Sequence, residues 1–313
     1  EEGQGLRPNI GIRGATAERS SNVTLMEDGV LTAPAPYSNP AAYYFPTLKR
    51  MSSLEVLKGA PLLRYGPQTT GGVINLISTP IPDEQKGYVE AVTNERGSTD
   101  VHATYGDTNG DWGYLFETVQ RSAQGFKDID RSNRNSGFDI SDYVGKLRWQ
   151  GDRQSVTAKL QYSEETSNSS YLGLTDADFS QDPNRRYGLS SPDQMDNTHS
   201  GVSLTHQFEW SDNVSSTTTL YRNDFKRNWY KLSGGGNIID AANAGDANAQ
   251  GILDGTVDTS GLNYKNNARE YVSQGVQTNF DVTIGNHEFD FGARAHEDEM
   301  DRFQPVDVYD QVN

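Results

Sequence analysis

From about residue 87 onward, apolar and polar residues alternate along the chain with a period of two. In Val156–Tyr162, for example, Val, Ala, Leu and Tyr alternate with Thr, Lys and Gln, and Val202–Trp210 repeats the pattern. Successive side chains of a strand point to opposite faces, so this alternation predicts strands with one apolar and one polar face. About nine are expected, at roughly 87–97, 99–107, 111–126, 138–150, 154–169, 198–211, 214–230, 268–284 and 287–303.

The connections between these strands are unequal. Some are tight turns: Asn109-Gly110, Gly151-Asp152, Ser211-Asp212-Asn213 and Gly285-Asn286. Others, near 164–199 and 232–267, are long and polar, and the low-complexity run 240–250 predicts a mobile loop. Short turns at one end, long loops at the other and alternating strands are typical of an outer-membrane β-barrel. Trp112, Trp149 and Trp210 lie near the short turns, where an interfacial girdle belongs. A soluble β-sandwich is the alternative.

Residues 1–85 differ from the rest of the chain in composition and in the pattern of apolar residues. They hold nine of the twelve prolines and short apolar runs, such as Val73–Ile77, that are typical of buried strands. This part is expected to be a small α+β domain with Gly- and Pro-rich loops. Glu1–Gly5 lacks the basic and apolar segments of a signal peptide, and Val306–Asn313 has no closing feature. We therefore expect a fragment of a longer chain.

Composition narrows the functional classes. The 313 residues are 34% hydrophobic but 10% aromatic, which argues against disorder, and no apolar run approaches the roughly 18 residues of a membrane-spanning helix. A net charge of -16 disfavours nucleic acid as a partner. The chain has no cysteine, and its five histidines show no HExxH spacing. No catalytic or metal site is predicted, and the acidic run His296–Asp301 is interpreted as solvated.

Four segments of the first domain carry a family resemblance. Asn9–Gly14, Met26–Val30, Leu54–Gly59 and Arg64–Ile77, which ends in Gly-Gly-Val-Ile-Asn-Leu-Ile, resemble the plug domain of TonB-dependent outer-membrane receptors. Arg64–Gln68 and Ala35–Tyr37 are most similar to ferric citrate and other ferric siderophore receptors. The resemblance implies an α+β plug over 1–85, lacking its beginning. Residues 86–313 would then be about nine strands of an expected 22-stranded antiparallel transmembrane β-barrel, with long extracellular loops near 164–199 and 232–267.

The same resemblance implies a function. A ferric chelate would bind at the plug apex and be imported with energy transmitted by TonB, without covalent chemistry and without a cofactor, the iron being chelated substrate. The implied location is the bacterial outer membrane, with the TonB complex, membrane lipid and lipopolysaccharide as partners and a monomeric barrel. Cobalamin, a nickel chelate or an oligosaccharide are alternative cargoes in the same fold. A soluble or surface β-rich binding or adhesin module is the second alternative.

A ferric chelate is usually anionic, so its site needs cationic, hydroxyl and amide donors. On the plug, the loop after Asp28 and the second apical loop supply candidates. On the barrel, they come from a long loop and from a strand on which alternation sets them opposite Tyr221 and Phe225. The candidate substrate-binding residues are Thr32, Tyr37, Asn39, Arg64, Gln68, Arg185, Arg186, Arg222 and Lys226.

Each group of candidates has a plainer interpretation. Thr32 and Asn39 could cap their own loop by local hydrogen bonds. Arg64, like Arg13 and Arg50, could form a salt bridge between plug and barrel wall, and Arg185 and Arg186 could be solvated loop residues. The stretch 190–196 is acidic where ferric citrate receptors carry arginines, which argues against citrate itself.

Overall fold

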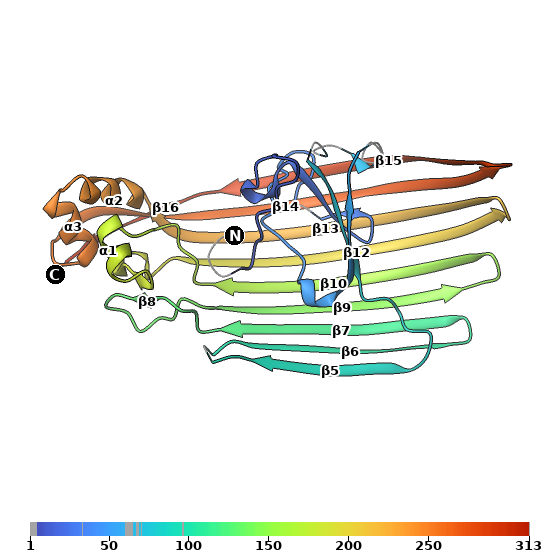
Figure 1. Ribbon diagram of the computed structural model, residues 1–313, viewed down its shortest axis with the longest axis horizontal. Helices are drawn as coiled ribbons and strands as arrows, with labels where there is room; N and C mark the ends of the chain where they lie inside the picture. The colour runs from blue at the N-terminus through green and yellow to red at the C-terminus, as the bar shows by residue number, and fades with distance from the viewer. Residues whose placement is uncertain are drawn as a thin grey trace.

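The computed structural model describes residues 5–32, 34–59, 65–66, 69, 71–95 and 97–312. These residues form two main sheets (Figure 1). A small sheet from the first part of the chain crosses one face of a large, curved sheet that the rest of the chain builds. The small sheet and its loops are called the plug below, and the large sheet is called the wall.

The plug sheet has four strands in the order β2-β1-β4-β3, in which β1 and β4 are parallel and the other neighbours antiparallel. Every residue of β1 and all but one of β4 are buried, because both faces of these strands are covered. The β1–β2 turn places Asp28 and Gly29 at left-handed φ angles of 51° and 78°, as a tight hairpin requires. The plug elements are η1 (Glu18–Ser20), β1 (Val23–Glu27), β2 (Val30–Leu31), η2 (Leu48–Arg50), β3 (Met51–Leu57) and β4 (Gly72–Ser78).

The wall is a ten-stranded antiparallel sheet in which neighbours along the chain are neighbours in space, and β16 pairs with the upper part of β14. Its nine long strands confirm the predicted barrel strands, although β12, β13 and β14 extend further than expected. The strands are β5 (Lys86–Thr93), β6 (Thr99–Asn109), β7 (Trp112–Ala123), β9 (Phe138–Gln150), β10 (Gln154–Ser167), β12 (Gln194–Ser211), β13 (Val214–Ser233), β14 (Thr259–Ile284), β15 (His287–Phe303) and β16 (Val306–Gln311).

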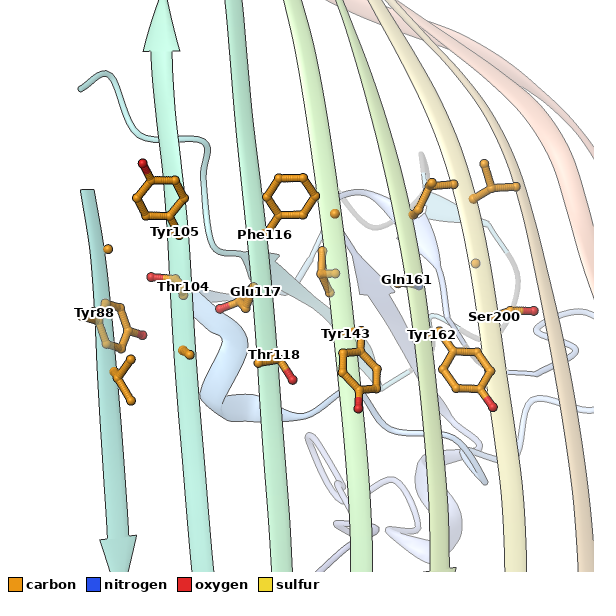
Figure 2. Close-up of a pocket in the computed structure, with 18 of the residues that line it drawn as sticks. Tyr88, Thr104, Tyr105, Phe116, Glu117, Thr118, Tyr143, Gln161, Tyr162 and Ser200 are labelled. Carbon is orange, nitrogen blue, oxygen red and sulfur yellow. The ribbon is translucent and has the colours of Figure 1, made fainter. Parts of the chain in front are cut away.

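The two faces of the wall meet different surroundings. One face packs on the plug. The other carries exposed aromatic and aliphatic side chains, and Figure 2 shows a shallow hollow on it, of about 1280 Å³, lined by Tyr105, Phe116, Tyr143 and Tyr162. Phe116 is 63% exposed on this face. Trp112 and Trp210 lie at the tight-turn end of this face, as the sequence predicted.

The end of the wall opposite the tight turns is called the upper end. Here, residues 126–136, 168–193 and 234–258 form a folded cap, the loop shell (Figure 1). Its core consists of Tyr187, Leu189, Leu232, Leu253, Leu262 and Tyr264. Its elements are β8 (Asp128–Ile129), α1 (Asp176–Gln181), β11 (Arg185–Arg186), η4 (Gly188–Ser190), α2 (Gly235–Asn243) and α3 (Ala247–Asp254). None of the described helices has the length and apolar character needed to cross a membrane.

The prediction of a mobile loop over 240–250 is wrong. This run contains the end of α2 and the start of α3, and the Asp246 carboxylate caps α3 by accepting hydrogen bonds from the backbone N–H groups of Asn248 and Ala249. Leu253 is fully buried in the shell core. The alanine-rich composition of this run is low in complexity, but alanine is also the best helix former.

Candidate functional site

A network of buried charges joins the plug to the wall near the β1–β2 turn. The guanidinium of Arg50 is 1% exposed, binds the carboxylate of Glu27, and donates from Nε to Asp142 Oδ2 on β9 at 2.8 Å. From β10, the Lys159 ammonium binds Glu27 and lies 2.7 Å from Asp28 Oδ2. These five residues are called the inner charge network. They confirm the interpretation of Arg50 as a salt bridge between plug and wall.

Charge in this network is balanced by direct contacts. Burial by itself would raise the pKa of Glu27, but Arg50 and Lys159 outweigh burial and hold that pKa well below its ordinary value. Burial likewise opposes ionisation of Asp28, whose pKa Lys159 and Lys146 lower. Lys146 also donates to Ser78 Oγ at 2.6 Å. Each carboxylate therefore has a cation within reach, so the network holds the plug without needing an added ion.

A second anchor lies on β15, in the acidic run that was predicted to be solvated. That prediction is wrong for alternate residues, because His296 and Asp298 point toward the plug and are 4% and 3% exposed. Asp298 Oδ2 accepts hydrogen bonds from the backbone N–H groups of Tyr37 and Ser38, at 2.8 and 3.2 Å. His296 bridges Asp298 and the Tyr221 hydroxyl, each at 2.7 Å. Because the side chains of a strand alternate between its two faces, the sequence of this run already indicates that only every second residue is solvated.

Further up the wall, cationic and aromatic side chains of plug, wall and loop shell converge. The Arg227 guanidinium lies over the Tyr43 ring at 3.8 Å, and the Lys231 ammonium lies 3.7 Å from the Tyr171 ring centre. Tyr171 stacks on Trp229 with ring centres 4.3 Å apart, and Arg19 reaches the Tyr171 hydroxyl. The cation–aromatic cluster comprises Arg19, Tyr43, Tyr171, Arg227, Trp229 and Lys231.

Arg227 is the unusual member of this cluster. It is 2% exposed, and none of its three guanidinium nitrogens has a hydrogen-bond partner of normal geometry among the described residues. It forms no ion pair within the described chain, and it faces Arg269 directly across the β13–β14 pair. Like charges opposite one another destabilise a sheet, and a buried cation without an acceptor is costly. Such an arrangement is suited to bind a multivalent anion.

The plug candidates lie lower than this cluster, against the wall. Thr32 is buried, its hydroxyl has no hydrogen-bond partner among the described residues, and it lines a polar gap of about 240 Å³ between plug and wall. Asn39 Nδ2 lies 3.4 Å from the Tyr271 hydroxyl on β14, and the Tyr37 ring lies 4.6 Å from His296. Arg64 and Gln68 lie outside the described residues.

Arg185 and Arg186 organise the loop shell. Arg185 contacts three carboxylates from three segments, Asp130, Asp178 and Asp254, at 2.7 to 3.1 Å. Arg186 is 5% exposed and donates to Ser190 Oγ and to backbone carbonyls. The interpretation of Arg185 and Arg186 as solvated loop residues is therefore wrong. Arg185 is occupied by its carboxylates and is not free for a ligand.

Arg222 and Lys226 point away from the plug. On β13 the odd-numbered residues from Tyr221 to Arg227 face the plug, and the even-numbered residues Arg222, Asp224 and Lys226 face outward. Arg222 pairs with Asp224 and Lys226 with Glu270 on this outer face. Their assignment to the lumen assumed that the polar face always points inward. The exposed apolar side chains of the outer face are called the apolar band, and on β13 they end at Leu220. Above this band, the plug-facing side of β13 is aromatic and its outer side is charged.

Sequence reasoning missed Arg227 by one position. Because a strand alternates with period two, the neighbour of an outward residue points inward. The available signal was that Arg227 shares its face with Tyr221, Phe225 and Trp229. The contributions of Arg19 and Tyr43 depend on how the plug loops fold back, which no local pattern records.

The comparisons with known proteins agree with this geometry. Residues 1–73 match the family model described as TonB-dependent Receptor Plug Domain. The chain carries a TonB-dependent receptor plug domain. This match confirms the resemblance read from the plug motifs. The matched family is one of receptors, which agrees with the prediction that the chain is not an enzyme.

Several solved structures share the fold of this chain. The ferric citrate transporter FecA, in its unliganded form, superposes with a TM-score of 0.76 at 20% identity, over 97% of this chain and 42% of that one. The siderophore receptor PiuA from Acinetobacter baumannii gives 0.68 at 14% identity over 96% and 42%. The ferric-catecholate import receptor Fiu from E. coli K12 gives 0.65 at 13% over 96% and 46%. The chain thus spans less than half the length of each.

Proposed function

We propose that this chain is the plug and the first nine strands of the barrel of a TonB-dependent receptor in the bacterial outer membrane, and that the receptor imports an anionic ferric chelate. The matched solved structures are about twice as long, and both edges of the described wall, β5 and β15, are exposed. An open edge in lipid leaves backbone groups unpaired, so further strands are needed to close the wall.

The observation that carries the proposed cargo is Arg227. A buried guanidinium that has no carboxylate partner among the described residues, and that lies opposite Arg269, is compensated when an anion with several oxygens binds. The proposed site therefore differs from the candidates read from the sequence. Its residues are those of the cation–aromatic cluster together with Arg269. Thr32, Tyr37 and Asn39 belong in this proposal to the plug–wall contact below the site.

Transport would follow from the position of this cluster. The chelate binds where plug, wall and loop shell meet, with the folded shell above it. TonB then draws on the plug from the opposite side of the membrane, the plug moves relative to the wall, and the chelate passes. The inner charge network and the Asp298 anchor are the contacts that must yield during this step.

An oligosaccharide is the main rival cargo, since sugars bind on flat aromatic faces. Trp229 is 2% exposed, with one face stacked on Tyr171, so it offers a sugar no free platform. The cations that converge around the buried Trp229 support an anionic chelate instead.

Tryptophan fluorescence of the complete receptor in detergent tests the proposal. Ferric citrate, ferric hydroxamates, ferric catecholates, cobalamin and malto-oligosaccharides are titrated in turn. We expect saturable quenching by a ferric chelate, loss of the signal in Trp229→Phe, and weaker binding by about 10- to 100-fold in Arg227→Met. Arg153→Gln, which removes one exposed positive charge at a tight turn, is the control. A response to cobalamin or sugar alone would overturn the cargo while leaving the fold unchanged.

A further inference from the structure

A second cavity lies where the loop shell meets the plug and β13, next to the stacked pair Tyr171 and Trp229. It has a volume of about 310 Å³, room for roughly ten water molecules at the volume of liquid water. Its wall is drawn from the plug, the β7–β9 connection, the β10–β12 connection and β13. Three cations line it, namely Arg7, Lys127 and Arg186, and of the cation–aromatic cluster Tyr171 and Trp229 line it as well.

The charges around this cavity are incompletely matched. Arg7 is 5% exposed and binds Glu165 through Nη1, while its Nε has no hydrogen-bond partner among the described residues. Arg186 donates to the hydroxyl and carbonyl oxygens of Ser190 and to the carbonyl of Asn168, all of them neutral acceptors. Within the described chain, the Lys127 ammonium forms no ion pair and no side-chain hydrogen bond.

The pKa directions agree with this geometry. Burial, and then the nearby Arg186, lowers the pKa of Lys127. Burial is also the leading cause that lowers the pKa of Arg186, against a smaller opposite effect of Asp193. Both shifts indicate that too few anionic groups lie near the Lys127 ammonium and the Arg186 guanidinium to offset the cost of burying their charges. The chain has a net charge of -16, so a cavity lined by three cations differs from its overall acidic composition.

We infer that this cavity binds a small oxyanion, with carboxylate or phosphate oxygens, at a site distinct from Arg227. Lys127 supplies the ammonium and Arg7 the unsatisfied N–H, whereas the Ser170 hydroxyl in the same wall already donates to Asp193. The oxyanion has two sources: a free ion, or a peripheral carboxylate of the chelate. The second source rests on the proposed function, whereas the first does not.

Thermal unfolding of the complete receptor in detergent, at constant ionic strength, tests the site with inorganic phosphate and with citrate free of iron. We expect either ion to raise the Tm of the wild type and of Arg227→Met alike. In Lys127→Gln the apparent affinity should fall by about tenfold, because a charge-assisted contact is lost. Among the described residues the Lys127 ammonium has no partner to lose, so Gln should leave the unliganded Tm unchanged. Arg153→Gln is the charge-matched control.

The outcomes separate the two sources and the two proposals. Binding of phosphate and citrate that weakens only in Lys127→Gln supports a free-ion site even where no ferric chelate binds. Weaker binding in Lys127→Gln of a ferric chelate that bears peripheral carboxylates, with no change for one that lacks them, assigns the site to an arm of the chelate. Equal Tm shifts in wild type and Lys127→Gln, together with equal affinity for both chelates, would overturn the inference.

Discussion

The plug meets the wall at two levels, and the charges at these levels are arranged in opposite ways. In the inner charge network every carboxylate has a cation in contact, and Arg50 is held by Glu27 and Asp142. On β13, Tyr221 lies level with Lys159 of the inner charge network. Arg227 lies six residues further up the same strand, or about 20 Å away, and at this level Arg227 faces another cation, Arg269. Both arginines are almost fully buried. Burial alone therefore does not tell a structural arginine from a ligand-binding one, whereas the partners do.

The largest effect is expected from Arg50→Met. Removing one member of a buried, hydrogen-bonded charge group leaves the others uncompensated, which typically costs about 3–5 kcal/mol. Here Glu27 and Asp142 would lose their shared partner. Hydrogen exchange in the complete receptor should become faster in β1 and β4, with chelate affinity little changed. Unchanged protection of these two strands would mean that the network contributes little to holding the plug.

Arg227→Met, unlike Arg50→Met, should raise the free energy of unfolding. The methionine side chain keeps much of the packing on Tyr43 and removes an unpaired charge, so the unliganded receptor should gain about 1–3 kcal/mol. The same variant should bind the chelate more weakly. Urea unfolding of the loop shell and upper wall, without ligand, measures the gain. A destabilised Arg227→Met variant would show that Arg227 has a structural role like that of Arg50, and the comparison would fail.

Asp193 is the anionic counterpart of Arg227 in the loop shell. It is 1% exposed and accepts hydrogen bonds from Ser170 Oγ at 2.6 Å and from the backbone N–H of Leu232 at 2.9 Å, without a direct ion pair among the described residues. Burial is the main cause that raises its pKa from 3.8 to about 6. Because the folded pKa is the higher one, the associated stability is fully present below pH 3.8 and is lost as the pH rises through 6.

Asp193→Asn removes the charge; its Oδ1 can still accept from the Leu232 N–H, and its Nδ2 can donate to Ser170 Oγ, which reverses the direction of that hydrogen bond. At pH 7 the loop shell should gain about 1–3 kcal/mol, since each pKa unit corresponds to about 1.4 kcal/mol. The difference should disappear near pH 4. Hydrogen exchange of residues 168–193, corrected for the intrinsic rate at each pH, measures it. Asp212→Asn at an exposed turn is the matched control. A stability gain in Asp193→Asn that does not depend on pH would contradict the raised pKa of Asp193.

The sequence supported the architecture better than the site, and particular residues show why. Nine strands could be placed because alternation is local, and the plug because its glycine-rich motifs are specific. Lys226 and Arg227 are adjacent and equally charged, so choosing between them required knowing which face of β13 meets the plug above the apolar band. Arg19 and Tyr43 belong to loops whose paths are fixed by long-range packing. Arg185 was recognised as important, but its three aspartates come from three separate segments.

The smallest effect is expected where the sequence first pointed. Arg222→Gln and Lys226→Gln each remove a charge from an exposed pair on the outer face, and such pairs contribute about 0–1 kcal/mol. Chelate affinity should change by less than about twofold, measured by the same fluorescence titration that reports on Arg227→Met, because neither side chain points to the plug. Stability should also stay within about 0.5 kcal/mol. A tenfold loss of affinity in either variant would place the chelate on the outer face and return Arg227 to a structural role.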